Sequence, residues 1–111
     1  TVWMQVLAYV EASGRCPFRR WFANLDPQAT SKITIALTRL EQGNLSNVKT
    51  VGAGVFEYRV DFGPGYRVYF GRDGEALIIL LGGGTKQRQE QDITAAHERW
   101  ADYKRRKKEQ N

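Results

Sequence analysis

The stretch that decides the fold spans residues 49–86 and reads KTVGAGVFEYRVDFGPGYRVYFGRDGEALIILLGGGTK. Between residues 55 and 62 apolar and polar side chains alternate, which is typical of a strand with one buried face. The alternation repeats from residue 66 to residue 70. The face opposite the apolar one carries Glu57, Arg59, Arg67 and Tyr69. Such a face suits the binding of a phosphodiester, and it equally suits ordinary cross-strand ion pairs in solvent.

Glycine and proline interrupt this stretch where a sheet would turn. Gly63-Pro64-Gly65 separates the two alternating strands, and Asp73-Gly74 is a strong two-residue hairpin signal. The residues that follow, 76–81, are apolar on both faces, so we expect this strand to lie inside the sheet. A brief strand is also expected over residues 49–51.

The remaining elements flank this sheet in the sequence. Residues 2–10 alternate with apolar side chains on both faces and predict a first strand. Pro17 and Pro27 each fit the first position of a helix, and the second helix is expected to end near Gln42. A last helix is expected from about Gln87 to Lys107. The order β-α-α-β-β-β-β-α predicts an α+β fold, in which an N-terminal helical hairpin and a C-terminal helix cover mainly one face of a twisted antiparallel sheet.

Composition restricts the class of protein. A chain of 111 residues with 41% apolar residues forms one domain without metal or disulfide support. The single cysteine, Cys16, permits no internal disulfide and fits a reducing cytosol. The single histidine, His97, lies among acids without the spacing of metal ligands. No secretory signal or membrane-spanning run appears, so we expect a cytoplasmic protein without membrane contact. We also expect no metal or cofactor. Since the chain opens on Thr1, we expect an initiator methionine or a few residues to precede it.

The net charge of +5 resides in one segment. Residues 104–108 supply five of the 17 basic side chains, and the remaining 12 balance the 12 acidic ones. We therefore divide the chain into a domain over residues 1–103 and a basic tail over residues 104–111. The tail is either the solvated end of a helix, where cations suit the dipole, or a nucleic-acid contact whose affinity depends on salt.

The run Gly82-Gly83-Gly84-Thr85-Lys86 lacks the spacing of a phosphate-binding loop of nucleotide hydrolases. Glycines at a strand end let the backbone approach a ligand, and a helix start attracts anions. Lys86 is therefore either a phosphate contact or a solvated residue on a flexible connector.

Three segments together resemble one family of bacterial toxins: PFRRWFANLD, RLEQGNLSNVKTVGAGVFEYRVDFGPGYRVYF and LLGGGTKQRQEQDITAA. They are similar to the RelE/ParE toxin superfamily, and more narrowly to its HigB-like branch of phage-derived, Gp49-like "addiction module killer" proteins. The resemblance implies a small α+β toxin that cuts mRNA on the ribosome, arrests growth and is neutralised by a cognate antitoxin, often a helix-turn-helix protein. The ParE side of the superfamily instead inhibits DNA gyrase without cutting RNA.

The resemblance also implies site residues. Arg67 matches the arginine of the family's GYR motif and would stabilise charge on the phosphate, while Arg59 and Lys86 match neighbouring cations. Glu57 stands where related nucleases carry a lysine and is our candidate base, and Tyr69 would stack on a base or share the proton transfer. The RNA contacts expected in addition are Lys49, Arg88, Lys104, Arg105, Arg106, Lys107 and Lys108.

Three functions remain open from the sequence. The first is a ribosome-dependent mRNA endoribonuclease, in which a ribose 2′-OH attacks the adjacent phosphorus without a metal. The second is a gyrase inhibitor without chemistry. The third is a nucleic-acid-binding domain that uses the basic residues 104–108. The histidines of some HigB enzymes have no counterpart, because His97 falls within the last helix.

Overall fold

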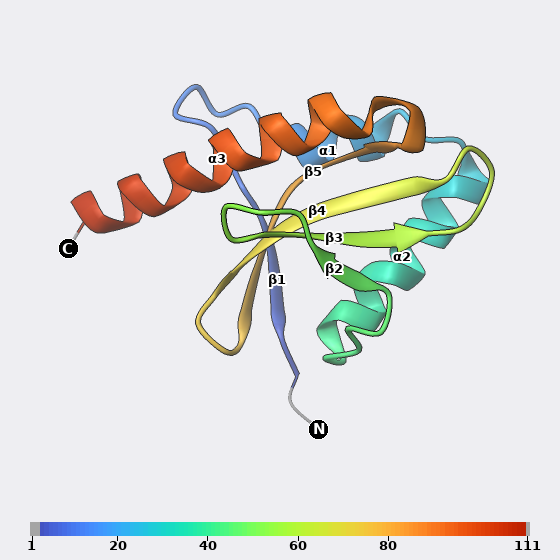
Figure 1. Ribbon diagram of the computed structural model, residues 1–111, viewed down its shortest axis with the longest axis horizontal. Helices are drawn as coiled ribbons and strands as arrows, with labels where there is room; N and C mark the ends of the chain where they lie inside the picture. The colour runs from blue at the N-terminus through green and yellow to red at the C-terminus, as the bar shows by residue number, and fades with distance from the viewer. Residues whose placement is uncertain (1–2, 111) are drawn as a thin grey trace.

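The structure, a computed structural model, describes residues 3–110. Within that range the elements follow the predicted order and form one sheet of five strands with three α-helices (Figure 1). The elements are β1 Gln5–Ala8, α1 Pro17–Ala23, α2 Pro27–Glu41, β2 Val48–Thr50, β3 Val55–Val60, β4 Tyr66–Asp73, β5 Leu77–Thr85, the 3-10 turn η1 Lys86–Arg88 and α3 Gln89–Glu109. The predicted α+β class is confirmed.

The sheet has the strand order β1-β5-β4-β3-β2. The three pairs from β5 to β2 are antiparallel, whereas β1 pairs with β5 in parallel, so the expectation of an antiparallel sheet is wrong for β1. Parallel strands need a long connection, and here the whole chain between β1 and β5 supplies it. The expected interior position of residues 76–81 is confirmed. The strand expected over residues 2–10 is shorter, since β1 begins at Gln5, and Val2 lies outside the described residues.

Local signals determine several element ends. The Asp26 side chain accepts a hydrogen bond of 2.8 Å from the backbone N–H of Ala29 and so caps α2, with Pro27 at its first position. Gly74 has φ +76° in the tight connection between β4 and β5, a conformation that favours glycine. The predicted hairpin is confirmed, but its expected two-residue loop is wrong: Asp73 still belongs to β4 and pairs with Leu77, so the loop consists of residues 74–76.

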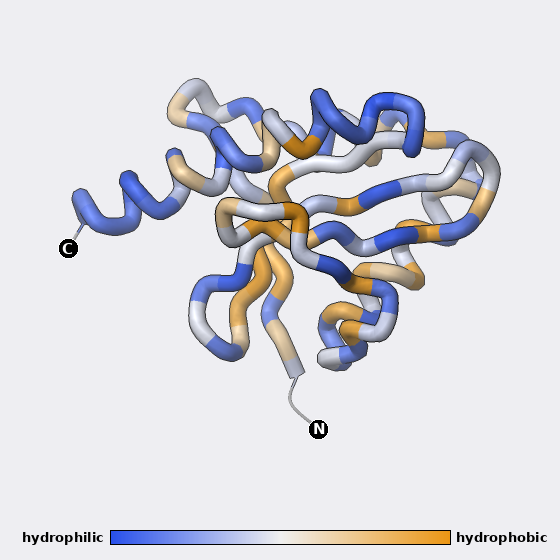
Figure 2. The backbone as a smooth tube through the Cα atoms, in the orientation of Figure 1, coloured by the Kyte–Doolittle hydropathy of each residue, from blue (hydrophilic) through white to orange (hydrophobic). Residues whose placement is uncertain are grey.

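Helices α1 and α2 cover one face of the sheet. The core between these two helices and the sheet contains the apolar residues that alternation assigned to the buried face. Figure 2 shows how apolar residues follow the strands. Its fully buried members include Ile33, Leu40, Val68, Phe70 and Ile78. The alternation in β3 and β4 therefore predicted this face correctly.

The opposite face is not open, because α3 crosses it. A second core joins the sheet to this helix and contains Val55, Tyr69, Ile79, Leu81, Ala96 and Trp100. Gly71 makes room for the close approach of α3, since a Cβ at this position would overlap the indole ring of Trp100. The expectation that helices lie mainly on one face is wrong: the chain turns back over the second face directly after β5.

No helix within the described range is long and apolar enough to cross a membrane.

Candidate active site

A buried carboxylate lies at the centre of the candidate site. Glu57 lies in β3, where it pairs with Tyr69 of β4 on one side and with Lys49 of β2 on the other. Its side chain is fully buried. Its Oε1 lies 3.5 Å from Nε of Arg67 and 3.7 Å from Nζ of Lys49. The amide of Gln89, the first residue of α3, donates a hydrogen bond of 2.7 Å to Oε2. Groups from β2, β4 and α3 thus hold this one carboxylate.

The expected open face with Arg67, Glu57 and Tyr69 in solvent is wrong. Arg67 is 5% exposed and Tyr69 is fully buried. The three side chains do point to the face that strand alternation predicted, but the first turns of α3 cover them. Arg67 also donates a hydrogen bond of 3.2 Å from Nη1 to the backbone carbonyl of Tyr66, which fixes the guanidinium against its own strand.

Four buried polar atoms in this region have no hydrogen-bond partner among residues 3–110: Oε1 of Glu57, Nε of Arg67, the hydroxyl of Tyr69 and Oδ2 of Asp92. We call these four residues the buried polar cluster. Burial raises the pKa of Tyr69, and the nearby carboxylates of Glu57 and Asp92 raise it further, so the phenol keeps its proton. Because unpaired buried polar groups are costly, such a concentration in one place indicates a functional site.

Asp92 and Gln89 are site residues that the sequence analysis missed. Burial raises the pKa of the Asp92 carboxyl, while Arg88 and Arg99 act in the opposite direction. The sequence did contain a signal for both residues. Ile93 and Ala96 are apolar residues on the side of α3 that packs on the sheet, and each of the two polar residues lies four positions before one of these. Residues at that spacing share a helix face, so both had to face the sheet.

The glycine run of β5 accommodates side chains of the protein itself. A Cβ at Gly84 would overlap Oδ2 of Asp92, and a Cβ at Gly83 would overlap the indole of Trp21 on the other face. The expectation that these glycines leave room for a ligand is therefore wrong. They allow α1 and α3 to pack closely on the two faces of β5, and the approach of α3 brings Asp92 into the buried polar cluster.

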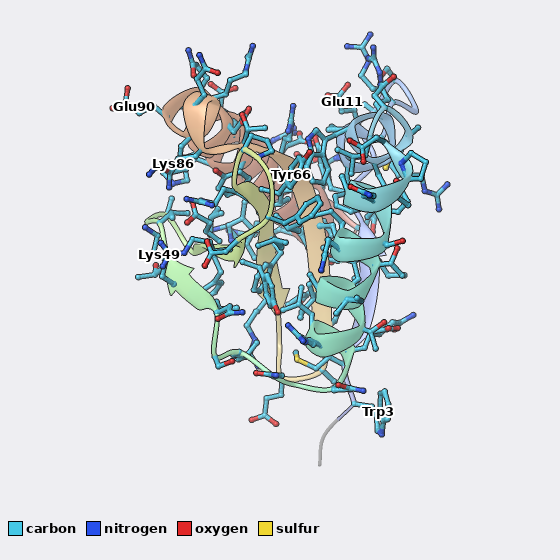
Figure 3. The ribbon with its side chains drawn as sticks, turned by 90° about the vertical axis from the view of Figure 1, so that its right-hand side faces the viewer. Trp3, Glu11, Lys49, Tyr66, Lys86 and Glu90 are labelled. Carbon is cyan, nitrogen blue, oxygen red and sulfur yellow. The ribbon has the colours of Figure 1, made fainter. Side chains whose placement is uncertain are left out.

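Cations surround this cluster at the surface. Lys49 and Arg59 have 61% and 56% of their side chains exposed, and Lys86 is exposed at the start of η1. Arg59 pairs with Arg67 across β3 and β4 and so lies next to the cluster. Lys49 and Lys86 point to the same side of the molecule (Figure 3). We call Lys49, Arg59 and Lys86 the cationic rim.

Lys86 and Arg67 both lie close to Gly65, in the turn before β4. The backbone N–H of Lys86 donates a hydrogen bond of 2.8 Å to the carbonyl of Gly65. A Cβ at Gly65 would lie 3.5 Å from Nη1 of Arg67 and 3.6 Å from Cβ of Lys86. Arg88, another predicted RNA contact, is exposed on the same turn as Lys86, η1.

The basic residues 104–108 lie away from this site, in the last turns of α3. The helix has 21 residues and is therefore about 30 Å long, so its basic end and its start at Gln89 lie far apart. Nζ of Lys107 forms an ion pair with Asp73, and Arg106 pairs with Asp102. The structure thus separates two groups of predicted RNA contacts that the sequence analysis treated together.

Within the described residues, no group of histidine, cysteine and acidic side chains could hold a metal ion. The Nε2 atom of His97 lies 2.9 Å from the carbonyl of Val51, a structural contact between α3 and the segment after β2. Cys16 is a free thiol at the N-cap position of α1.

The sequence matches a known protein family and a known bacterial protein. The model of the family described as Phage derived protein Gp49-like matches residues 20–101. A protein of Haemophilus influenzae strain Rd, named only as an uncharacterized protein, is 42% identical over 80 residues, which are 71% of this chain and 81% of that protein. The family match includes all residues of the buried polar cluster and of the cationic rim.

Proposed function

The chain belongs to the phage-derived Gp49-like family, and we propose that it is the toxin of a type II toxin–antitoxin pair that cuts mRNA on the ribosome. The observation that carries this proposal is the buried carboxylate of Glu57, held against Arg67 and Lys49 beneath a surface of cations. The resemblance of the quoted motifs to the addiction-module branch supports the same function.

The cationic rim would bind the RNA backbone. Lys49, Arg59 and Lys86 are exposed and lie around the buried polar cluster, so phosphates bound to them would lie directly above Glu57 and Arg67. Binding of this kind is independent of base sequence and weakens with salt. It would leave the choice of cleavage position to the ribosome, which presents the mRNA.

The buried polar cluster supplies the groups that the reaction needs. The ribose 2′-oxygen attacks the adjacent phosphorus, the bond from phosphorus to the 5′-oxygen breaks, and the products are a 2′,3′-cyclic phosphate and a 5′-OH. Glu57 accepts the proton of the 2′-OH, and Arg67 stabilises the negative charge of the transition state. Tyr69 gives a proton to the leaving 5′-oxygen, a role for which its retained phenol proton is suited.

Burial of these groups requires a local movement before the substrate can reach them. Oε2 of Glu57 accepts a hydrogen bond from Gln89, so the first turn of α3 must shift to expose the carboxylate. We propose that docking on the ribosome causes this shift, and that Lys86 in η1, immediately before α3, contacts the mRNA at that moment. The free protein would then have little nuclease activity of its own.

One observation favours the alternative of a gyrase inhibitor. Glu57, Arg67 and Tyr69 are buried. Groups that only hold the fold together would be buried in the same way, and an inhibitor without chemistry needs no more from them. A translation extract programmed with a single mRNA and analysed by primer extension separates the two functions. The proposed toxin should produce new 5′ ends within the reading frame, only while ribosomes translate. Intact mRNA together with an early fall of DNA synthesis in cells would establish the gyrase inhibitor. Intact mRNA with neither effect would leave a nucleic-acid-binding domain.

A further inference from the structure

Helix α3 covers only part of its sheet face. Its C-terminal half extends beyond the sheet (Figure 1), and a groove of about 450 Å³ lies between this half and the strands β1 and β5. Leu7 pairs with Ile79 across β1 and β5, and both line the groove together with Leu77 and Tyr103. Leu7 is 45% exposed, so the apolar floor of the groove is open to solvent.

The strand beside the groove lacks the usual protection of a sheet edge. β1 is the last strand on its side of the sheet, and residues 3–10 contain no charged side chain. Leu7 and Val10 are each 45% exposed, and Trp3 is 66% exposed. Edge strands of monomeric proteins normally carry charges that prevent association, so this edge has the character of a surface that is covered in use.

The wall of the groove is basic. Residues 104–108 place five cations on the last turns of α3, and Arg106 and Lys107 line the groove directly. Arg106 pairs with Asp102 and Lys107 pairs with Asp73, which also lines the groove. With Glu109 there are three carboxylates against five cations, so a partner would meet an excess of two positive charges at this end of the helix. Figure 2 shows the contrast between this hydrophilic end of α3 and the apolar strands beside it.

We propose that this groove binds an acidic amphipathic helix of a partner protein. A second helix lying beside α3 would complete the half-covered layer on this face, as α1 and α2 together complete the other. Its apolar stripe would pack on Leu7, Leu77 and Tyr103, and its acidic positions would face Arg106 and Lys107. The apolar floor favours a protein segment over RNA, which would use the cations alone.

This assignment gives residues 104–108 a role in protein binding rather than in RNA binding. The inference rests on the proposed function only in identifying the partner as the antitoxin. The groove and the buried polar cluster lie toward opposite ends of α3, so a partner helix in the groove would leave the cationic rim free. Neutralisation through this groove would therefore act by excluding the toxin from the ribosome, not by occupying Glu57 or Arg67.

The test uses the full chain and a displayed library of helical peptides about four turns long, with an apolar stripe and randomised polar positions. Selection should enrich peptides with glutamate and aspartate at the polar positions. A selected peptide is then synthesised, and its binding is measured with the wild-type chain by NMR titration. We expect amide shifts at Leu7, Leu77 and Tyr103. Enrichment of basic peptides, the absence of any enrichment, or shifts elsewhere on the surface would overturn the proposal.

A matched pair of variants tests the same point by affinity. Leu7→Asp should weaken binding of the acidic peptide at least about tenfold, because it places a like charge on the apolar floor. Ile35→Asp on the outer side of α2 is the control, since Ile35 is 47% exposed and lies outside the groove. Equal loss in both variants would overturn the groove as the binding site, and so would tight binding of an oligouridine RNA that competes with the peptide.

Failure of this inference and failure of the proposed function give different results. If the groove binds acidic helices but the wild-type chain does not arrest growth, the toxin function fails and the groove remains. If the wild-type chain arrests growth but the groove fails these binding tests, only this inference fails. Leu7→Asp should still arrest growth when expressed alone, because Leu7 touches neither the buried polar cluster nor the cationic rim.

Discussion

Oε1 of Glu57 lies 3.5 Å from Nε of Arg67, and the two side chains are 0% and 5% exposed. The pair joins β3 to β4 beneath the start of α3, in a place that is closed to solvent. Removal of either partner would leave an uncompensated buried charge. Variants that test the chemistry must therefore be chosen so that the fold survives the substitution.

Tyr69→Phe is the cleanest test of catalysis. The hydroxyl is buried without a hydrogen-bond partner, so its removal should raise the free energy of unfolding by about 1 kcal/mol. If Tyr69 donates the proton to the leaving oxygen, mRNA cleavage in the translation extract should fall about 100-fold. Tyr58→Phe, buried on the opposite face, is the control and should cut normally. Full cleavage by a stable Tyr69→Phe protein would remove this residue from the mechanism.

Arg67→Met should destabilise the protein by about 3–5 kcal/mol, because the buried carboxylate of Glu57 loses its guanidinium. The double variant Glu57→Met with Arg67→Met should be more stable than Arg67→Met alone. Arg59→Met is the matched control, since Arg59 is 56% exposed and its substitution should cost less than about 1 kcal/mol. Urea unfolding of the wild type, the single variants Glu57→Met and Arg67→Met, the double variant and Arg59→Met measures these differences. Strict additivity of the two single losses would show that the pair is not coupled.

Asp92→Asn should stabilise the protein at neutral pH and have no effect in acid. Burial raises the pKa of Asp92 above its ordinary value of 3.8, so the folded state binds this proton more tightly than the unfolded state. Stability of the wild-type protein therefore falls as the pH rises from 3.8 to the raised value, and the variant lacks this fall. The Tm difference across this pH range measures the effect. Glu98→Gln, on the exposed side of α3, should show no such dependence.

Asp73→Asn should have the opposite pH dependence. Hydrogen bonds from Lys107 and Tyr103 hold the pKa of this carboxyl below its ordinary value. Its stabilising contribution is complete above pH 3.8 and is lost as the pH falls through the lowered pKa. The variant should therefore have a lower Tm at pH 7 and the wild-type Tm at the acid end. Asp61→Asn serves for comparison, because Asp61 is 86% exposed and should leave Tm unchanged at both ends.

Lys86→Gln should weaken binding to ribosomes that carry mRNA and should reduce its dependence on salt. One lost phosphate contact lowers the slope of log K against log salt by about 0.7–0.9. Arg19→Gln is the control, because it removes one positive charge at an exposed position of α1, the helix that packs on the opposite face of the sheet from the buried polar cluster. Equal effects of both substitutions would mean that net charge, and not a contact of Lys86, determines the affinity.

Much of the fold could be predicted because its signals are local. Alternation with period two assigned Tyr58 and Val68 to one face and Glu57 and Arg67 to the other, and the structure confirms both assignments. Pro27 and Gly74 marked a helix start and a hairpin for reasons that depend only on neighbouring backbone groups. Repetition of such patterns over residues 49–86 was sufficient to predict the strands and the order of the elements.

What covers each face was decided only in the tertiary structure. Alternation states to which side of a strand Glu57 points, but not that Gln89, 32 positions later, donates to its carboxylate. The same limit applies to β1, whose parallel pairing with β5 joins Leu7 to Ile79 and creates the groove beside α3. By itself the sequence determined the strands, most of their turns and the identity of the polar residues. Whether these residues are solvated or buried depended on the path of α3, because contacts between distant segments follow from the packing of the whole chain.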